Sequence, residues 1–367
     1  MPERRKVLFL VPSLGAGGAE RVFSILLRHL DRSRFELHLG VLQGKGEYLE
    51  DLPDDVVLHD LSAARVRYAL PSLVKLAWRV RPDTILSTLG HLNLALILIR
   101  PFMPRGIKLL IREAAIASVV LREEGRYPGL YTWLYRHLYK RAHRIVCLSD
   151  SMVSDMAEHF NVPREKLVRI YNPIDIKRVR AMAEIGENPY SGLGPHLVAA
   201  GRLTRQKGFD VLLNAMPYVL DRLPDARLSI LGLGDLRQEL VDQAIRLGIA
   251  EKVYFLGFQK NPWLYLRYAD LFVLSSRYEG MPNIVLEALA LGLPVVAADC
   301  PGALREMKDS VKRIVLVPGE NPGALAEAIV EVCGETQRGR EWRHSRQGIG
   351  MFDLQQVVGE YSKLLSG

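Results

Sequence analysis

Short apolar runs alternate with helical patterns along this chain, and the alternation occurs twice. The runs predicted to be strands in the first half are Lys6–Val11, Phe35–Val41, Val56–Leu58, Asp83–Ser87, Lys108–Ile111 and Arg144–Cys147. After a Gly- and Pro-rich loop at Gly186–Pro195, the predicted strands are Leu197–Ala200, Arg227–Leu231, Val253–Leu256, Leu271–Leu274 and Val295–Ala297. Strand–helix alternation is typical of a parallel sheet covered on both faces. The pattern predicts two doubly wound α/β domains, residues 1–173 and 174–349, with ligands at the carboxyl ends of the strands, between the domains.

Length and composition agree with this prediction. A chain of 367 residues suits two domains of about 150 to 200 residues better than one. The longest apolar run, Leu94–Ile99, is much shorter than a membrane span, so no segment is expected to cross a bilayer. Cys147, Cys300 and Cys333 form no CxxC pair, which argues against a zinc ribbon or redox pair and favours a cytoplasmic, reducing compartment.

A glycine-rich segment follows the first predicted strand. Gly15, Gly17 and Gly18 stand between that strand and a helix that opens at Ala19. Glycine lets the backbone approach an anion, and the first N–H groups of a helix favour negative charge. The segment lacks the third glycine of a GxGxxG fingerprint, so an NAD site is not expected. A phosphate site and a plain tight turn remain the two interpretations.

A basic segment follows the strand Leu197–Ala200. It contains Arg202, Arg205 and Lys207 before Gly208. Cations at the carboxyl end of a strand suit a diphosphate, because arginine offers a planar fork of donors and lysine a point charge. A solvated basic loop is the alternative.

Two glutamates, Glu279 and Glu287, stand eight residues apart after the strand Leu271–Leu274. A helix is expected to begin near Pro282, since proline is favoured in a first turn. Exposed N–H groups near Gly280 to Asn283 suit a phosphate. Carboxylates accept hydrogen bonds from sugar hydroxyls, so one glutamate would hold a transferred sugar and the other a ribose. The alternative for Glu287 is a solvated helix residue.

With these three segments in this order and at this spacing, the chain resembles the retaining glycosyltransferases of the GT-B fold, in the GT4-like (group 1) family. The resemblance covers nearly the whole chain. It also rests on Pro12–Arg21, Asn172–Asp175, Phe255–Gly257, Pro294–Ala297 and Glu306. It implies two Rossmann-like domains facing each other across a cleft, with a final helix at about 350–367 crossing back onto the first domain.

The resemblance also implies roles for individual residues. The residues implied to bind the donor are Gly17, Gly18, Arg202, Lys207, Gly257, Phe258, Gly280, Met281, Asn283 and Glu287. Arg202 and Lys207 would neutralise the leaving diphosphate, and Glu279 would face the transferred sugar. His91 and Glu113 each follow a strand of the first domain and are the candidates for an acceptor-side catalytic residue, although either is also compatible with a structural role. No metal and no cofactor are expected.

The predicted reaction transfers a hexose or N-acetylhexosamine from a nucleotide-diphosphate sugar, expected to be a UDP-sugar, with retention of configuration. The acceptor is expected to be lipid-linked or a polysaccharide. One alternative is a nucleotide-sugar epimerase of the same fold, which needs acid and base groups on both faces of the sugar. The other is a non-catalytic nucleotide-sugar-binding protein, against which the intact charged motifs argue.

The positive charge is concentrated in the first half. Residues 1–175 contain 26 Lys and Arg against 19 Asp and Glu, which is +7 of the net +8. Aromatic and basic residues alternate at helical spacing in Tyr127–Arg141. Such a segment is typical of a helix at an anionic membrane surface, although a helix with a buried aromatic face has the same pattern. We expect a peripheral protein on the cytoplasmic face of a bacterial membrane, with no nucleic-acid partner.

Overall fold

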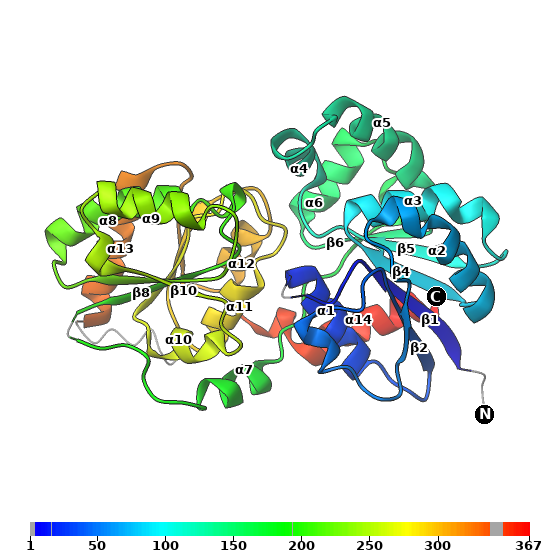
Figure 1. Ribbon diagram of the computed structural model, residues 1–367, viewed down its shortest axis with the longest axis horizontal. Coiled ribbons are helices and arrows are strands. Elements are labelled where there is room, and N and C mark those ends of the chain that lie inside the picture. The colour runs from blue at the N-terminus through cyan, green and yellow to red at the C-terminus, as the bar shows by residue number, and fades with distance from the viewer. Residues whose placement is uncertain (1–3, 16, 193, 338–347) are drawn as a thin grey trace. The chain divides into compact units, whose positions relative to one another are not determined.

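The computed structural model describes residues 4–15, 17–192, 194–337 and 348–367. The chain divides into two compact units. Unit 1 contains Met1–Pro173 and Leu354–Gly367, and unit 2 contains Ile174–Asp353 (Figure 1).

Unit 1 is built on a parallel sheet in the order β3-β2-β1-β4-β5-β6-β7. Its strands are β1 (Arg5–Val11), β2 (Phe35–Val41), β3 (Val57–Asp60), β4 (Thr84–Thr88), β5 (Lys108–Arg112), β6 (Arg144–Cys147) and β7 (Leu167–Arg169). Its helices include α1 (Gly18–His29), α2 (Val66–Val80), α3 (Gly90–Ile99), α4 (Ala117–Glu123), α5 (Pro128–Leu138), α6 (Asp150–Ser154) and α14 (Leu354–Ser366). The short 3₁₀ turns η2 (Arg100–Phe102) and η3 (Tyr139–Arg141) follow α3 and α5.

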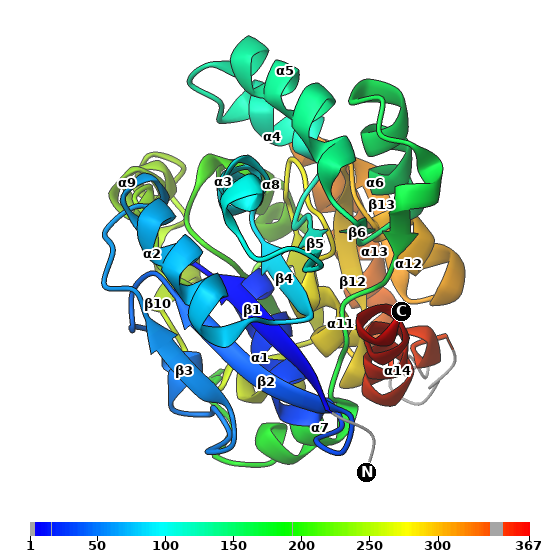
Figure 2. The ribbon, with the colours of Figure 1, turned by 90° about the vertical axis from the view of Figure 1, so that its right-hand side faces the viewer.

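The sheet of unit 1 carries helices on both faces. α2 and α3 cover one face, and α5 lies beside α3 (Figures 1 and 2). On the other face, apolar residues of α1 and α14 share one core with β1 and β2, including Phe23, Phe9 and Tyr361. Because the last helix buries its apolar side in this core, the C-terminal segment belongs to unit 1. β2 and β3 extend the sheet on one side of β1, and β4 to β7 extend it on the other. The topological switch point therefore lies between β1 and β4.

The last helix, predicted at about 350–367, is α14. Residues 350–353, just before it, belong to unit 2. The Ile174 N–H donates to the carbonyl of Phe352 at 2.9 Å, and Phe352 is fully buried. These contacts tie the segment to unit 2, and the helix begins at Leu354.

Unit 2 repeats the architecture with the strand order β10-β9-β8-β11-β12-β13. Its strands are β8 (His196–Ala200), β9 (Arg227–Leu231), β10 (Val253–Gly257), β11 (Leu271–Leu274), β12 (Val295–Asp299) and β13 (Ile314–Pro318). Its helices include α7 (Ile176–Ala183), α8 (Phe209–Arg222), α9 (Arg237–Arg246), α10 (Pro262–Tyr268), α11 (Asn283–Ala290), α12 (Leu304–Ser310) and α13 (Pro322–Gln337). The switch point lies between β8 and β11, so the segments that follow these two strands share one edge of the sheet.

The helix in the segment Tyr127–Arg141 is shorter than the segment itself. α5 ends at Leu138, and the turn η3 follows it. Tyr135, Leu138 and Tyr139 face the interior, whereas Trp133 is 55% exposed. The segment therefore has a buried aromatic side and an exposed one. Across the described ranges, every helix is too short or too polar to cross a bilayer.

Candidate functional site

The basic segment and the glutamate segment meet at the switch point of unit 2. Residues 201–208 follow β8, and residues 275–280 follow its parallel neighbour β11. Gly208 has φ +60°, and a Cβ at this position would collide with the carbonyl oxygen of Ser275. The hydroxyl of Ser275 in turn donates to the carbonyl of Lys207 at 2.9 Å. The structure therefore brings together two of the segments that the sequence selected.

A buried ion pair lies at this junction. Lys207 Nζ is 2.6 Å from Glu279 Oε1, and Ser276 Oγ donates to the same oxygen at 2.6 Å. Glu279 is 5% exposed and Ser276 is 1% exposed. Coulombic interactions are strengthened where water is excluded. The cluster therefore offers a cation for an anionic group and a fixed carboxylate for a hydroxyl or a developing positive charge.

The Glu279 loop is held by the segment that follows β12. The Glu279 N–H donates to the carbonyl of Pro301, and the Ala303 N–H donates to that of Gly280, both at 2.9 Å. Gly302 has φ +140°, and a Cβ there would lie 2.5 Å from the Glu279 carbonyl oxygen. The loop therefore rests on a surface that only glycine permits. Gly280 and Met281, both predicted donor contacts, are buried in this packing.

Glu287 lies inside α11 and is 2% exposed, so its interpretation as a solvated helix residue is wrong. The indole Nε1–H of Trp263, on α10, donates to Glu287 Oε2 at 2.6 Å. Trp263 is itself 7% exposed. A buried carboxylate needs such partners, because removing an ion from water is costly. Trp263 therefore orients Glu287, a relation that no sequence pattern indicated.

The remaining predicted donor residues of unit 2 are more exposed. Arg202 follows β8 with an exposed side chain, and within the described part of the chain it forms no ion pair or side-chain hydrogen bond. Asn283 is the first residue of α11. Gly257 ends β10 with φ +68°, and Phe258 beside it is 41% exposed. β9 separates β10 from β8, so Phe258 shares the edge but not the immediate junction.

The glycine-rich segment lies at the switch point of unit 1. Gly17 is the N-cap of α1 and Gly18 is its first residue. The preceding loop is held by hydrogen bonds from the Leu14 N–H to Lys45 and from the Tyr48 N–H to Leu14, at 3.2 and 3.1 Å. This places a helix start at the carboxyl end of β1, where a phosphate is favoured. The phosphate role itself remains a prediction.

His91 and Glu113 have different surroundings. His91, the second residue of α3, is exposed, and desolvation by neighbouring atoms lowers its pKa. Leu89, just before α3, has φ +76°, an uncommon backbone conformation that costs about 1–3 kcal/mol and often marks functional sites. His91 therefore stands at an accessible and strained turn beside the switch point.

Glu113 is buried, whereas a residue that contacts an acceptor needs an accessible side chain. It is 4% exposed, and its Oε1 accepts hydrogen bonds from Tyr139 Oη at 2.5 Å and from Asn93 Nδ2 at 2.9 Å. Ser87 extends the network by donating to Asn93 Oδ1 at 2.6 Å. Burial raises the pKa of Glu113 to about 7, against the opposing effects of Tyr139, Asn93 and Arg112. Glu113 therefore acts as a structural member of a buried network in this conformation.

Four residues that hold the candidates in place were not predicted from the sequence: Ser276, Trp263, Asn93 and Tyr139. Ser276 carried a signal, since it lies two residues after the end of β11. In the portion of the chain that the structure describes, no group of three or more His, Cys, Asp or Glu residues is arranged to hold a metal ion.

Family models match both units. "Glycosyltransferase Family 4" matches residues 16–178, and "Glycosyl transferases group 1" matches residues 194–335. An uncharacterized glycosyltransferase of Methanocaldococcus jannaschii is 34% identical over 189 residues, which are 50% of this chain and 47% of that protein. The alignment thus spans about half the length of that relative.

Two other similarities extend over whole chains. The N-acetylgalactosamine-N,N'-diacetylbacillosaminyl-diphospho-undecaprenol 4-alpha-N-acetylgalactosaminyltransferase of Campylobacter jejuni is 26% identical over 377 residues, 99% of this chain and 100% of that protein. The crystal structure of Anabaena HepE in complex with UDP has a TM-score of 0.75 at 21% identity, and the match covers 98% of this chain and 99% of that one. The second similarity shows the fold. With family matches on both units, a relative aligned end to end and two parallel-sheet α/β units, this chain belongs to the group 1 (family 4) glycosyltransferases of the GT-B fold.

Proposed function

We propose that this chain transfers a hexose or N-acetylhexosamine from a UDP-sugar to a lipid-linked or polysaccharide acceptor, with retention of configuration. The observation that carries the proposal is the buried Lys207–Ser276–Glu279 cluster at the switch point of unit 2. Family membership supports the reaction class. The UDP bound to the Anabaena protein and the undecaprenol-linked substrate of the Campylobacter relative support the donor and the acceptor.

The charges of the cluster suit the chemistry of glycosyl transfer. As the diphosphate leaves, negative charge grows on its oxygens and positive charge grows on the sugar. Preorganised charges stabilise such a transition state more than the ground state. Lys207 and the exposed Arg202 supply cations for the diphosphate, and Glu279 faces the sugar. Attack by the acceptor on the face that the diphosphate leaves gives retention. The step needs no metal in this proposal.

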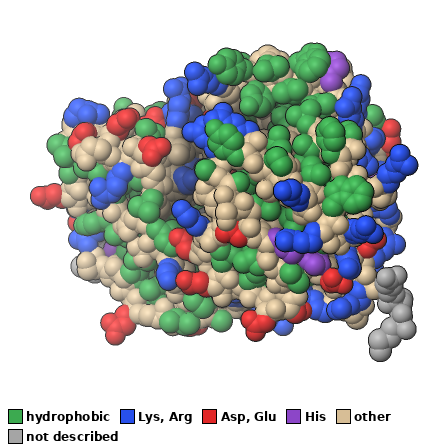
Figure 3. All heavy atoms as spheres, turned by 45° about the vertical axis from the view of Figure 1, so that its right-hand side comes forward, with side chains coloured by type: hydrophobic (Ala, Val, Ile, Leu, Met, Phe, Trp, Pro, Cys, Tyr) green, Lys and Arg blue, Asp and Glu red, His purple; other side chains and the backbone are tan. Residues whose placement is uncertain are grey.

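A peripheral position on a cytoplasmic membrane face is part of the proposal. Unit 1 exposes large apolar side chains on α2, α3, η2 and α5 and at the N-cap of α5, which are Tyr68, Trp78, Leu98, Phe102, Leu130, Trp133 and the N-cap residue Tyr127. Figure 3 shows hydrophobic side chains gathered in the upper part of the view, with lysine and arginine between them. Aromatic side chains favour the membrane interface, and basic residues favour anionic lipid.

The experiment has two stages. A thermal-shift screen against UDP- and GDP-sugars identifies the donor, and release of nucleoside diphosphate is then measured with and without a bacterial lipid extract. The proposal expects stabilisation by a UDP-sugar and release that increases with the extract. Formation of an epimeric sugar nucleotide without acceptor would support the epimerase. Donor binding with no turnover under any condition would support a binding protein.

A further inference from the structure

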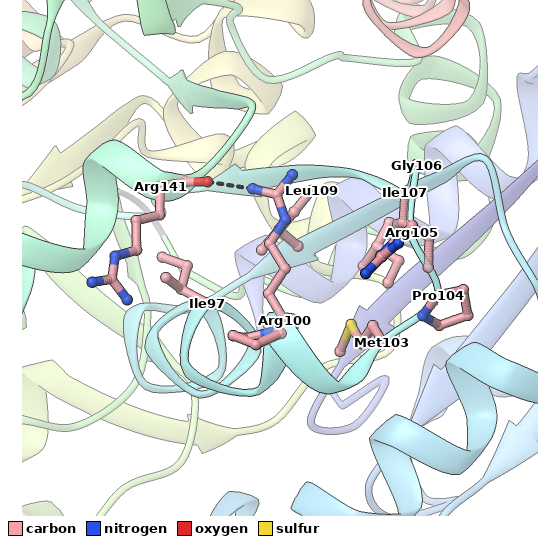
Figure 4. A pocket seen from close by; sticks show the side chains of 11 residues that line it. Ile97, Arg100, Met103, Pro104, Arg105, Gly106, Ile107, Leu109 and Arg141 are labelled. Atoms are coloured by element: carbon pink, nitrogen blue, oxygen red, sulfur yellow. Dashed lines mark hydrogen bonds between the residues drawn. The ribbon is translucent and has the colours of Figure 1, made fainter.

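A pocket of about 480 Å³ lies in unit 1 (Figure 4). Ile85 and Leu109, near the amino ends of β4 and β5, contribute to its lining. The glycine-rich segment and His91 lie at the carboxyl ends of strands of the same parallel sheet, which is the opposite edge. The pocket is therefore separate from the glycine-rich segment and from His91.

The pocket combines an apolar lining with three arginines. Ile97 and Met103 supply apolar surface, and Arg100, Arg105 and Arg141 supply positive charge. Figure 4 shows Arg100 reaching the backbone of Arg141, whose carbonyl accepts its hydrogen bond. Among the residues that the structure describes, no carboxylate pairs with any of the three guanidinium groups. These charges are therefore available to an anion from outside the chain.

More cations surround this end of the unit. Burial lowers the pKa of His143, and the nearby charges of Arg144, Lys108, Arg100 and Lys166 lower it further. The four charges with the largest effect on the pKa of His143 are thus all cations. A pocket in such a field attracts anions, and guanidinium groups match phosphate oxygens in a bidentate manner.

The surface beside the pocket is apolar and exposed. Phe102, between the lining residues Pro101 and Met103, is 69% exposed, and Leu98 is 49% exposed. Trp78 is 51% exposed, and its indole N–H donates to the Phe102 carbonyl at 2.9 Å. A soluble phosphate ion would make no apolar contacts with these side chains. The phosphate of a membrane lipid, in contrast, is attached to acyl chains and lies at an interface that favours aromatic rings.

We propose that this pocket binds the phosphate headgroup of an anionic phospholipid, with the positive charges of Arg100, Arg105 and Arg141 attracting the phosphate oxygens. The glycerol and upper acyl chain would pack on Ile97 and Met103, while Phe102 and Trp78 enter the interface. The inference rests on the proposed function, which places this chain at a membrane surface. It adds a defined binding site for one lipid headgroup to the general attraction between basic residues and anionic lipid. Lipid binding here requires no sugar transfer.

The first test compares two double variants that remove the same charge. Arg105→Ala/Arg141→Ala removes two pocket arginines, and Arg122→Ala/Arg164→Ala removes two arginines that pair with Glu123 and Glu158. Binding to vesicles of phosphatidylglycerol and phosphatidylcholine is measured by flotation. At about 1 kcal/mol for each basic residue, the pocket variant is expected to bind roughly 30-fold more weakly, and the control close to wild type. An equal loss of vesicle affinity in both double variants would overturn the proposed headgroup site and would favour general charge attraction.

The second test separates the two sources of phosphate. The wild type is titrated calorimetrically with dihexanoyl phosphatidylglycerol below its micelle concentration and, separately, with inorganic phosphate. The proposal expects saturable lipid binding that is tighter than phosphate binding and is lost in Arg105→Ala/Arg141→Ala. Equal affinity for both would assign the site to free phosphate, and no binding of either would overturn the proposal. UDP-induced thermal stabilisation of the variant serves as the folding control. If the wild type fails to bind any nucleotide sugar, the proposed function fails while the lipid result stands.

Discussion

Replacing Glu113 with glutamine should make unit 1 more stable at high pH, relative to the wild type, than at low pH. Burial raises the pKa of Glu113 from 4.5 to about 7. A carboxyl whose pKa is raised by folding contributes stability that is complete below pH 4.5 and is lost as the pH rises through about 7. Glutamine keeps an oxygen that accepts from Tyr139 and Asn93, but it does not titrate.

The magnitude follows from the size of the shift. At 1.36 kcal/mol per pKa unit, a shift from 4.5 to about 7 corresponds to about 3.4 kcal/mol, of which about 2.5 kcal/mol falls between pH 5 and pH 8. The free energy of unfolding of Glu113→Gln, minus that of the wild type, should therefore rise by about 2.5 kcal/mol over this interval. Native-state hydrogen exchange of amides in β4, β5 and β6 measures this difference for unit 1.

The matched control is Glu158→Gln, at an exposed position paired with Arg164, where water screens the charge. The free energy of unfolding of Glu158→Gln, minus that of the wild type, should change far less between pH 5 and pH 8. If the Glu113→Gln difference stays constant within about 0.5 kcal/mol, the buried carboxyl does not titrate as described. A change of opposite sign would mean that Arg112 holds Glu113 charged.

Three further predictions concern the proposed donor site. Trp263→Phe removes the indole N–H that donates to the buried Glu287; at about 1.5–3 kcal/mol for a hydrogen bond to a charged group, the KM for the nucleotide sugar should rise by roughly 10- to 150-fold with kcat unchanged, and an unchanged KM would show that Trp263 does not contribute to nucleotide-sugar binding. Arg202→Ala should lower kcat/KM by roughly 100- to 1000-fold, about 2.7 to 4 kcal/mol, and wild-type turnover would remove Arg202 from the site. Transfer should persist in excess EDTA, and a complete loss that Mg²⁺ restores would contradict the metal-free proposal.

The fold could be predicted from the sequence because strand–helix alternation, which is visible in short segments, determines that the strands of the whole sheet are parallel. Parallel strands joined by helices place their carboxyl ends on one edge, so Lys207 and Glu279 could be expected to lie close together although 72 residues separate them. The short strand β7 and the strand β13 were not predicted. The apolar run at Ile314–Val317 is bounded by Arg313 and Pro318, and it becomes a strand by pairing with β12.

Burial and side-chain pairing were not predictable in the same way. Arg112 ends β5 and Glu113 follows it, and two adjacent charged residues at the end of a strand are typical of a surface. Both are nevertheless buried, because hydrogen bonds join Arg112 to Asn172 and Thr88 and join Glu113 to Asn93 and Tyr139. Such long-range contacts depend on how helices pack on the sheet. The Trp263–Glu287 bond likewise joins α10 to α11, and no spacing in the sequence encodes it.

In the proposed function, glycosyl transfer depends on the Lys207–Ser276–Glu279 cluster. Glu279→Gln tests it most directly, because glutamine preserves the shape and an acceptor for Ser276 while it removes the negative charge. Single-turnover transfer from the identified UDP-sugar to the lipid extract gives the rate, and calorimetry gives the donor Kd. The account predicts a rate lowered by at least about 100-fold with a donor Kd within about threefold of wild type. Wild-type transfer by Glu279→Gln would contradict it.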